Sequence, residues 1–195
     1  YPGFNITAGL VAATFYLYRR AQSNKWDTFE VLDFWVMSVS FGLSLFHLGT
    51  FFAGIGYGYQ TNWYWGVVFP NLLEPHHPVQ LYFAFLYFCL SFFLSKVEYS
   101  YRTFEWYRYG KKTAQTGFLT AFFLIFSACF SLAMSFFHLP VLVWDNLSFD
   151  RLLAGFFLVV GLGLLYVRSG RPVPQFGHQT QKPSRISLEA LKERK

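Results

Sequence analysis

Two stripes of polar residues inside apolar runs are the features of this chain best suited to chemistry. His47, Thr50 and Gly54 are spaced i, i+3 and i+7, so on a helix they share one face. The imidazole of His47 either forms a hydrogen bond to a neighbouring helix as a neutral ring or contacts a substrate or lipid headgroup. No metal site is expected, because no second ligand stands at metal-binding spacing on that helix.

The second stripe is formed by three serines and a histidine. Ser127, Ser131, Ser135 and His138 follow one another at steps of four, four and three residues. In one interpretation these small residues allow two helices to pack closely, with each hydroxyl bonded to its own backbone. In the other, the stripe lines a binding site.

These stripes must be positioned by membrane helices. The chain has five apolar runs, at residues 6–18, 31–53, 79–95, 117–137 and 152–167. A helix of ~20 apolar residues spans a bilayer. Lipid cannot form hydrogen bonds with backbone amides, so a spanning segment forms a helix in which the amides bond to one another. We therefore predict an all-α polytopic membrane protein with about five transmembrane helices in residues 1–170. Residues 171–195 form a polar tail, in which Ser187 is suited to cap a short amphipathic helix.

The basic residues alternate between the ends of these runs. Residues 54–78 and 138–150 contain no Lys or Arg, whereas the stretches between the other runs and the tail are basic. Basic loops stay on the cytoplasmic side, so we predict an outside N-terminus and a cytoplasmic C-terminus in a bacterial inner membrane. Arg151 is the exception to the pattern. The first run has no basic region before it and no small-residue cleavage site after it, so no cleavable signal peptide is expected.

Composition excludes several functional classes. Hydrophobic residues make up 54% of the chain and charged residues only 13%, although the net charge is +6. Most aromatic side chains lie inside apolar runs, away from Lys and Arg, so nucleic-acid binding is not expected. Cys89 and Cys129 each lie in the middle of a run, so neither a disulfide nor a metal framework is predicted. No cofactor is expected.

The predicted orientation brings the outer ends of both stripes to one side of the membrane. His76 and His77 lie on that side as well. Five spans packed together would therefore gather polar groups at an outward-facing region. Gly54 and Gly58 in this region match a small-residue helix-packing pattern, or else they mark a backbone that bends closely around a ligand.

Several motifs of this region resemble the prolipoprotein diacylglyceryl transferase family. They are Trp-Gly-Val-Val-Phe-Pro at residues 65–70, His-Pro-Val-Gln-Leu-Tyr at residues 77–82 and the glycine-spaced stretch 42–58. Residues 117–140 match the spacing of the penultimate span of the family. The resemblance implies a bacterial inner-membrane enzyme that moves a diacylglyceryl group from phosphatidylglycerol to the cysteine of a lipoprotein precursor. The residues shared with the family are Gly42, Gly49, Gly54, Gly58, Trp65, Pro70, His77, Pro78, Gln80, Tyr82, Gly117 and Pro140.

The departures from the family pattern remove charged groups. The family signature has arginine at the positions of His47, Ser131 and His138, and glutamate at those of Ile55, Phe83 and Ser135. It has asparagine at Thr50 and Ala53, and its essential histidine falls at Phe4. Because a phosphate leaving group develops negative charge, removing one stabilising contact typically costs ~100–1,000-fold in rate.

We therefore expect a catalytically inactive relative of these enzymes that binds phospholipid. It would associate with other membrane protein subunits as a structural component of a larger complex. The expected lipid-binding residues are His47, Thr50, Gly54, Gly58, Gln80, Tyr82, Ser131, Ser135 and His138. The alternative is an active, divergent transferase in which His47, His77 or His138 takes the place of arginine. An unrelated polytopic protein is a third possibility.

Overall fold

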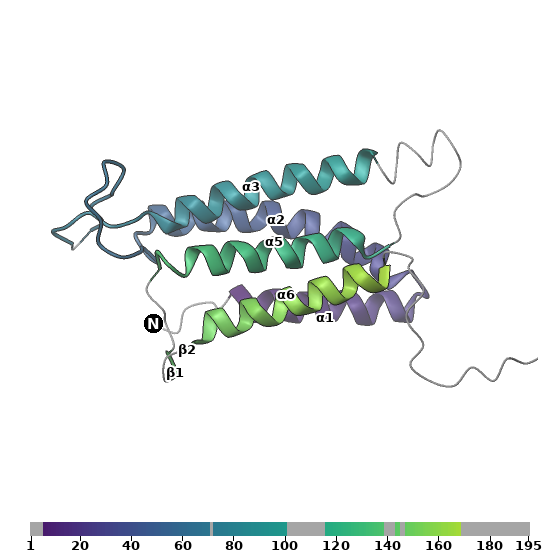
Figure 1. The fold of residues 1–195 in the computed structure, drawn as a ribbon. Coiled ribbons are helices and arrows are strands. Elements are labelled where there is room, and N and C mark those ends of the chain that lie inside the picture. Colours follow the sequence, from purple (N-terminus) through teal and green to yellow (C-terminus); the bar gives the residue numbers. More distant parts are fainter. Residues whose placement is uncertain (1–5, 71, 101–115, 139–142, 145–146, 169–195) are drawn as a thin grey trace, which may run out of the picture.

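The computed structural model describes residues 6–70, 72–100, 116–138, 143–144 and 147–168. Within these residues the chain forms five helices lying side by side along one long axis (Figure 1). They are α1 (Ile6–Ser23), α2 (Thr28–Phe52), α3 (Val79–Val97), α5 (Phe118–Met134) and α6 (Phe149–Arg168). The prediction of an all-α membrane protein is confirmed, and each predicted run coincides with a helix.

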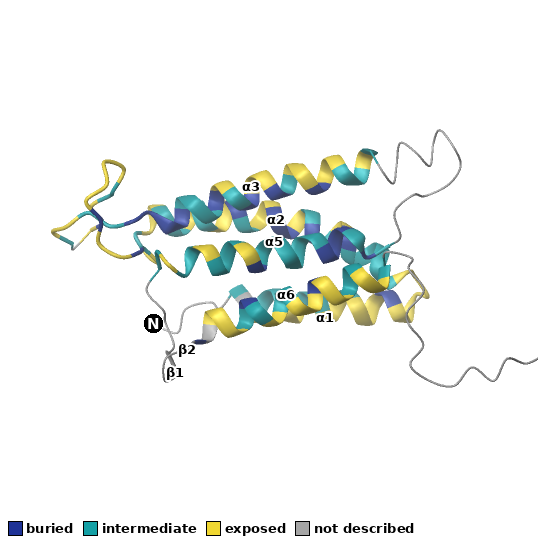
Figure 2. Ribbon diagram, in the orientation of Figure 1, coloured by how far each residue is buried: buried dark blue, intermediate teal, exposed yellow. Residues whose placement is uncertain are grey.

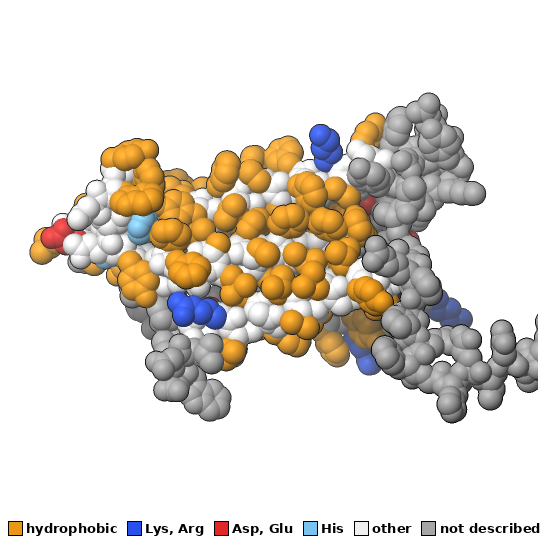
Figure 3. All heavy atoms as spheres, viewed as in Figure 1, with side chains coloured by type: hydrophobic (Ala, Val, Ile, Leu, Met, Phe, Trp, Pro, Cys, Tyr) orange, Lys and Arg blue, Asp and Glu red, His pale blue; other side chains and the backbone are white. Residues whose placement is uncertain are grey.

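Three helical segments are long and apolar enough to cross a membrane: Thr28–Phe52, Val79–Ser100 and Asp150–Arg168. Phe118–Met134 is apolar but shorter, with 17 residues. Figure 3 shows hydrophobic side chains along the whole length of the helices on this face, with charged side chains toward the ends. The orientation of the chain in the membrane stays a prediction.

The sequence did not predict strands, but the segment before α6 contains two. Strands β1 (Val143–Trp144) and β2 (Leu147–Ser148) pair in an antiparallel manner, with two residues each. Strands of two residues are too short to show an alternation of apolar and polar residues, so the sequence pattern did not predict them. The polar tail 171–195 with its helix expected from Ser187, together with Phe4 and Pro140, lies outside the described residues.

The turn between α1 and α2 is fixed by local hydrogen bonds. The backbone nitrogen of Trp26 donates to the Ala21 carbonyl at 3.0 Å, and Lys25 has φ +57° in the left-handed region that ends many helices. Asp27 then caps α2 by accepting a hydrogen bond from the Phe29 nitrogen at 3.0 Å. The two helices are thereby held as an antiparallel pair.

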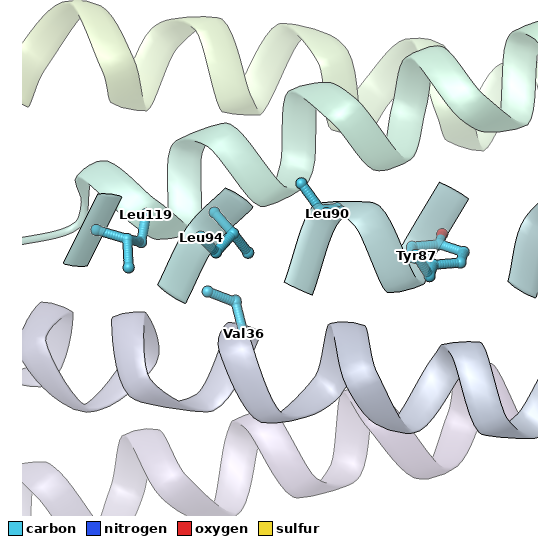
Figure 4. Packing of buried hydrophobic residues seen from close by; sticks show 5 residues of the cluster. All are labelled: Val36, Tyr87, Leu90, Leu94 and Leu119. Carbon is cyan, nitrogen blue, oxygen red and sulfur yellow. The ribbon is translucent and has the colours of Figure 1, made fainter. Parts of the chain in front are cut away.

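The core lies where α2, α3 and α5 meet. Its buried residues are Val36, Tyr87, Leu90, Leu94 and Leu119, and Figure 4 shows Val36 of α2 pointing toward Leu94 of α3. α6 packs on α5, and α1 packs on α2. In Figure 2, buried positions concentrate on α2, α3 and α5, while much of α6 is exposed. The helices α1 and α6 therefore lie on the outside of a three-helix core.

One buried carboxylate joins α2 to the start of α5. Asp33 is fully buried and accepts hydrogen bonds from the backbone nitrogen of Gly117 at 2.8 Å, and from the nitrogen and hydroxyl of Thr120. Gly117 has φ +94°, and a Cβ there would lie 3.0 Å from the ring of Phe29. Gly117 offers no side chain to cap α5, so a side chain of another helix does so.

The connection between α2 and α3, residues 53–78, folds back on itself through backbone hydrogen bonds. Gly58 donates to the carbonyl of His77 at 2.9 Å, and Tyr59 donates to the carbonyl of Phe137 at 2.8 Å. Val67 and His76 exchange two hydrogen bonds. We call this end of the helices, with residues 53–78 and 135–138, the loop end, and the opposite end, with residues 24–27 and 116–117, the turn end.

Candidate functional site

A cavity of about 990 Å³ lies between α1, α2, α5 and α6. It forms because α1 packs on α2 and α6 packs on α5, which leaves a space between these two layers. Its walls are mostly aliphatic and aromatic and include Leu10, Val39, Phe123, Phe157 and Leu164. A cavity of this size and polarity suits a largely apolar ligand.

The histidine, aspartate and arginine side chains that line this cavity lie at the loop end. With the serines beside them they come from the end of α2, the end of α5 and the start of α6, and are His47, Ser131, Ser135, His138, Ser148, Asp150 and Arg151. Farther along the cavity the hydroxyls of Thr14 and Thr120 are hydrogen-bonded to Trp35 and Asp33. The cavity is therefore amphipathic, with a mostly apolar body and a polar mouth. Both sequence stripes reach it, since His47 comes from the first and Ser127, Ser131, Ser135 and His138 from the second.

The imidazole of His47 lies among aromatic rings. It stacks on Phe83, with ring centroids 4.9 Å apart and planes at 16°, and is nearly parallel to Tyr87 at 5.8 Å. Phe46 meets it edge-on at 5.4 Å. The neighbouring aromatic side chains stack on the imidazole and make its environment apolar, and they provide no ionic partner. His47 is thus a part of the cavity wall with one polar edge.

The serine stripe divides between two roles. Ser135 Oγ donates to the carbonyl of Leu132 at 2.7 Å, as expected for a hydroxyl that bonds its own helix. Ser127 Oγ is buried beside the side chain of Tyr87. α5 and α6 also approach closely, since a Cβ on Gly161 would lie 2.9 Å from the side chain of Ile125. That contact is made by Ile125, which is not part of the stripe, whereas Ser127, Ser131 and Ser135 line the cavity.

His138 follows α5 and lies at the polar mouth. Burial lowers the pKa of its imidazole, and the nearby negative charge of Asp150 acts in the opposite direction. The net effect favours a neutral ring at pH 7. A neutral imidazole can accept a proton or donate one hydrogen bond, but it supplies no fixed positive charge.

Arg151 is the site residue that sequence reasoning missed. It lies in the first turn of α6, and its Nε and Nη2 atoms donate to the hydroxyl and the carbonyl oxygen of Ser135, each at 3.3 Å. The signal was present in the sequence, because Arg151 is the one basic residue that breaks the charge alternation.

A smaller cavity of about 230 Å³ adjoins the first and shares His47 and His138 with it. Thr50 and Gln80 also line it. The amide nitrogen of Gln80 donates to the Ile55 carbonyl at 2.9 Å, which leaves Oε1 buried and without a donor among the described residues. Gln80 therefore anchors the loop after α2 to α3, and Thr50 donates to the carbonyl of His47 within its own helix.

His77 and Tyr82 belong to a network beside the cavities. Tyr82 Oη lies 2.9 Å from Trp65 Nε1, which donates to it, and 3.2 Å from His77 Nδ1. The His77 ring is buried against Trp63 and Phe137, and burial lowers its pKa. Neither residue lines a cavity described above. His76 instead faces the carbonyl of Glu74. Of the three histidines predicted to converge on this side, only His138 lines the large cavity.

The glycines of this loop serve close backbone packing. Gly54 has φ +68°, in the left-handed region that favours glycine. Gly58 lies so close to the carbonyl oxygen of Phe137 that a Cβ would not fit there. Both residues follow the end of α2, so the helix-packing interpretation of this pair is wrong. The close approach is to another part of the chain, and Gly58 thereby ties the loop to the end of α5.

Within the described part of the chain, no group of three or more His, Cys, Asp or Glu side chains could hold a metal ion. Cys89 and Cys129 are free and exposed on α3 and α5.

Residues 2–167 match the family model of the prolipoprotein diacylglyceryl transferases. The chain belongs to this family. It is 29% identical over 172 residues to a phosphatidylglycerol–prolipoprotein diacylglyceryl transferase of Rickettsia akari, covering 84% of this chain and 62% of the relative. The corresponding protein of Aeromonas hydrophila is 25% identical over 175 residues, covering 87% and 60%. That of Haemophilus influenzae is 36% identical over 86 residues, covering 43% and 32%.

The chain thus spans about 60% of the length of the relatives that it matches most fully. The match to the family includes the glycine-spaced stretch and both loop motifs. The resemblance implies a charged residue at six positions of this chain. Five of them line the large cavity: His47, Phe83, Ser131, Ser135 and His138. The sixth, Ile55, lines the smaller cavity beside it.

Proposed function

We propose that this protein holds a phospholipid in the cavity between α1, α2, α5 and α6 and does not transfer its diacylglyceryl group. The observation that carries the proposal is the amphipathic cavity, with an apolar body along the helices and polar groups at one end. A glycerophospholipid has the same division, because its acyl chains are apolar and its headgroup is polar. The family relatives are named for phosphatidylglycerol, which makes this lipid the first one to test.

We infer the absence of transfer from the groups that face the cavity. Transfer requires stabilisation of the leaving phosphate and a base that activates the acceptor thiol. Among the described lining residues Arg151 alone supplies a fixed positive charge, because His47 is stacked among aromatic rings and the serines at positions 131 and 135 are uncharged. The protein then acts as a non-catalytic, lipid-containing subunit of a membrane assembly, to which the exposed apolar residues of α6 offer a contact surface, among them Leu152, Phe156 and Val159.

One observation favours the alternative of an active, divergent transferase. His138 lies at the cavity mouth close to Asp150, whose charge acts to raise the pKa of the imidazole. In this alternative His138 is the base that takes the thiol proton, and the diacylglyceryl group passes to the thiolate as the headgroup phosphate departs.

Native mass spectrometry of the purified protein in detergent tests the cavity. Wild type is expected to retain added phosphatidylglycerol, and Ser131→Phe is expected to weaken retention by narrowing the polar mouth of the cavity. Ala133→Phe is the matched control, because Ala133 is exposed on the same helix and does not line the cavity. Equal lipid retention by the two variants would contradict the proposed site.

Turnover is measured separately with radiolabelled phosphatidylglycerol and a peptide that carries a lipoprotein cleavage-site cysteine. The proposal expects lipid binding without labelled peptide. Labelled peptide that disappears with His138→Ala, while lipid binding persists, would establish the alternative.

A further inference from the structure

Arg151 is the single Lys or Arg among the described residues that line the large cavity. It lies at the loop end, where residues 54–78 and 138–150 contain no Lys or Arg. Its guanidinium is held on the end of α5 by two hydrogen bonds to Ser135, one to the hydroxyl and one to the carbonyl oxygen. A cation is thus held at the polar mouth of the cavity.

The guanidinium keeps donors free for a ligand. Arginine has five N–H donors in a planar fork, and Nε and Nη2 are the atoms engaged with Ser135. Among the described residues no carboxylate forms an ion pair with Arg151. A charged side chain within or beside a membrane span is costly unless it has a function or a counter-ion, and the guanidinium fork matches the geometry of a phosphate.

We propose that Arg151 binds the phosphate of a glycerophospholipid whose acyl chains occupy the cavity, with Ser135 positioning the guanidinium. This inference rests on the proposed function, since it assigns the headgroup contact of the lipid held there. Arg151 is on α6, whereas the family positions that carry arginine correspond to residues of α2 and to residues at or just after the end of α5 in this chain. The positive charge is therefore supplied from a different helix.

The neighbouring groups favour a lipid phosphate over a free anion. Asp150 lines the same mouth and its carboxylate opposes the general attraction of anions. His47 and His138 face the mouth as well, and His138 is neutral at pH 7 because burial lowers its pKa. The mouth therefore attracts free anions only weakly. A lipid phosphate can still bind there, because burial of its acyl chains in the cavity provides most of the binding free energy.

The test compares two lipids that share their acyl chains. Dioleoyl phosphatidylglycerol carries the phosphate and dioleoylglycerol does not, and both are titrated into the detergent-solubilised protein and read by native mass spectrometry. Arg151→Gln is expected to weaken phosphatidylglycerol binding by about 10- to 100-fold, the range for loss of hydrogen bonds to a charged group, and to leave dioleoylglycerol binding unchanged. Arg151→Lys keeps the charge but loses the fork, and an intermediate loss is expected.

Arg19→Gln is the control, because Arg19 is an exposed arginine of α1 that does not line the cavity. It is expected to bind both lipids as wild type does. Ser135→Ala is expected to weaken phosphatidylglycerol binding less than Arg151→Gln. Circular dichroism and thermal unfolding of each variant establish that a loss of binding is not a loss of fold.

The outcomes separate this inference from the proposed function. If wild type binds neither lipid, the lipid-binding cavity itself is refuted. If wild type and Arg151→Gln bind phosphatidylglycerol equally well, the cavity stands and the role of Arg151 is overturned. Inorganic phosphate forms a third arm, and phosphate binding that depends on Arg151 while phosphatidylglycerol binding does not would overturn the assignment to a lipid headgroup.

Discussion

The Asp33 carboxylate accepts hydrogen bonds from both the backbone nitrogen and the hydroxyl of Thr120, at 2.9 and 2.7 Å. Thr120 is in the first turn of α5, where backbone N–H groups have no partner within the helix. Asp33 therefore caps α5 from α2, across 87 residues of sequence. The contact fixes the position of α5 along α2, and with it the side of the cavity that carries the serine stripe.

We expect Asp33→Asn to destabilise the protein by about 1.5–3 kcal/mol, because hydrogen bonds to a charged acceptor become neutral ones. Asp33→Ala removes all acceptors and is expected to cost more, since buried donors are left without partners. The measurement is unfolding in detergent with an added denaturant. A double-mutant cycle with Thr120→Val isolates the pair, and additive effects of the two substitutions would refute the coupling.

Gly117→Ala is expected to destabilise the protein by about 1–3 kcal/mol, the cost of a left-handed backbone in a residue with a side chain. The new methyl group would also lie 3.0 Å from the ring of Phe29. Gly163→Ala is the matched control, because Gly163 is on α6 with open space around it and has no positive φ. That control is expected to be neutral or slightly stabilising, and an equal loss in both variants would contradict the account of Gly117.

Tyr82→Phe removes the hydroxyl between Trp65 and His77 and is expected to destabilise the protein by about 1 kcal/mol. The hydroxyl accepts from Trp65 Nε1 at 2.9 Å, so the indole loses its partner in the variant. Tyr64→Phe serves as the control, since Tyr64 is 93% exposed. Thermal unfolding should separate the two variants, and identical midpoints would show that the network adds no stability.

Stability should fall as the pH drops below about 6.5, the ordinary value for histidine. Burial lowers the pKa of His77 and of His138 in the folded state, so the unfolded state binds protons first. The stability that these two histidines contribute is fully present above their pKa in the unfolded state. It is lost as the pH falls toward their lower pKa in the folded state. Unfolding midpoints between pH 7.5 and pH 5 measure it, and the double variant His77→Asn, His138→Asn should show a smaller dependence.

Asp27 does not disturb this measurement. Its partial burial acts to raise the pKa, but hydrogen bonds from Thr116, Phe29 and Glu30 and the charge of Arg168 lower it below the ordinary 3.8. The stability from this carboxylate is present above the unfolded pKa and is lost only as the pH falls through the lower folded value. A pH dependence between 7.5 and 5 that is unchanged in the histidine double variant would therefore contradict the assignment.

The helices were predictable because their signals are local. Each apolar run became a helix. α1, α2 and α3 extend beyond the predicted run at one end and α6 at both, whereas α5 is shorter than its run. Residues 24–27 form the turn from hydrogen bonds that reach five residues or fewer. The Gly54 and Gly58 pair shows the opposite case, because the same spacing occurs in helices and in loops and only the end of α2 decides between them.

The site was predictable in part. His47 and the serine stripe were identified from their spacing, and the structure places both at one cavity. His77 stands in a recognisable motif, yet its ring turns toward Tyr82 and away from the cavity lining. The direction of a side chain in an irregular loop depends on the packing around it, and no residue spacing encodes that direction.

By itself, the sequence determined that this is a helical membrane protein of the diacylglyceryl transferase family, because apolar run length and ordered motifs are properties of the chain read in order. The tertiary structure decided which helices enclose the cavity, that Asp33 caps a helix 87 residues away, and that Arg151 reaches Ser135 at the cavity mouth. The physical reason is that such contacts depend on how each helix is rotated and shifted against its neighbours. Many packing arrangements are compatible with the same hydrophobic pattern, and the packed core selects one of them.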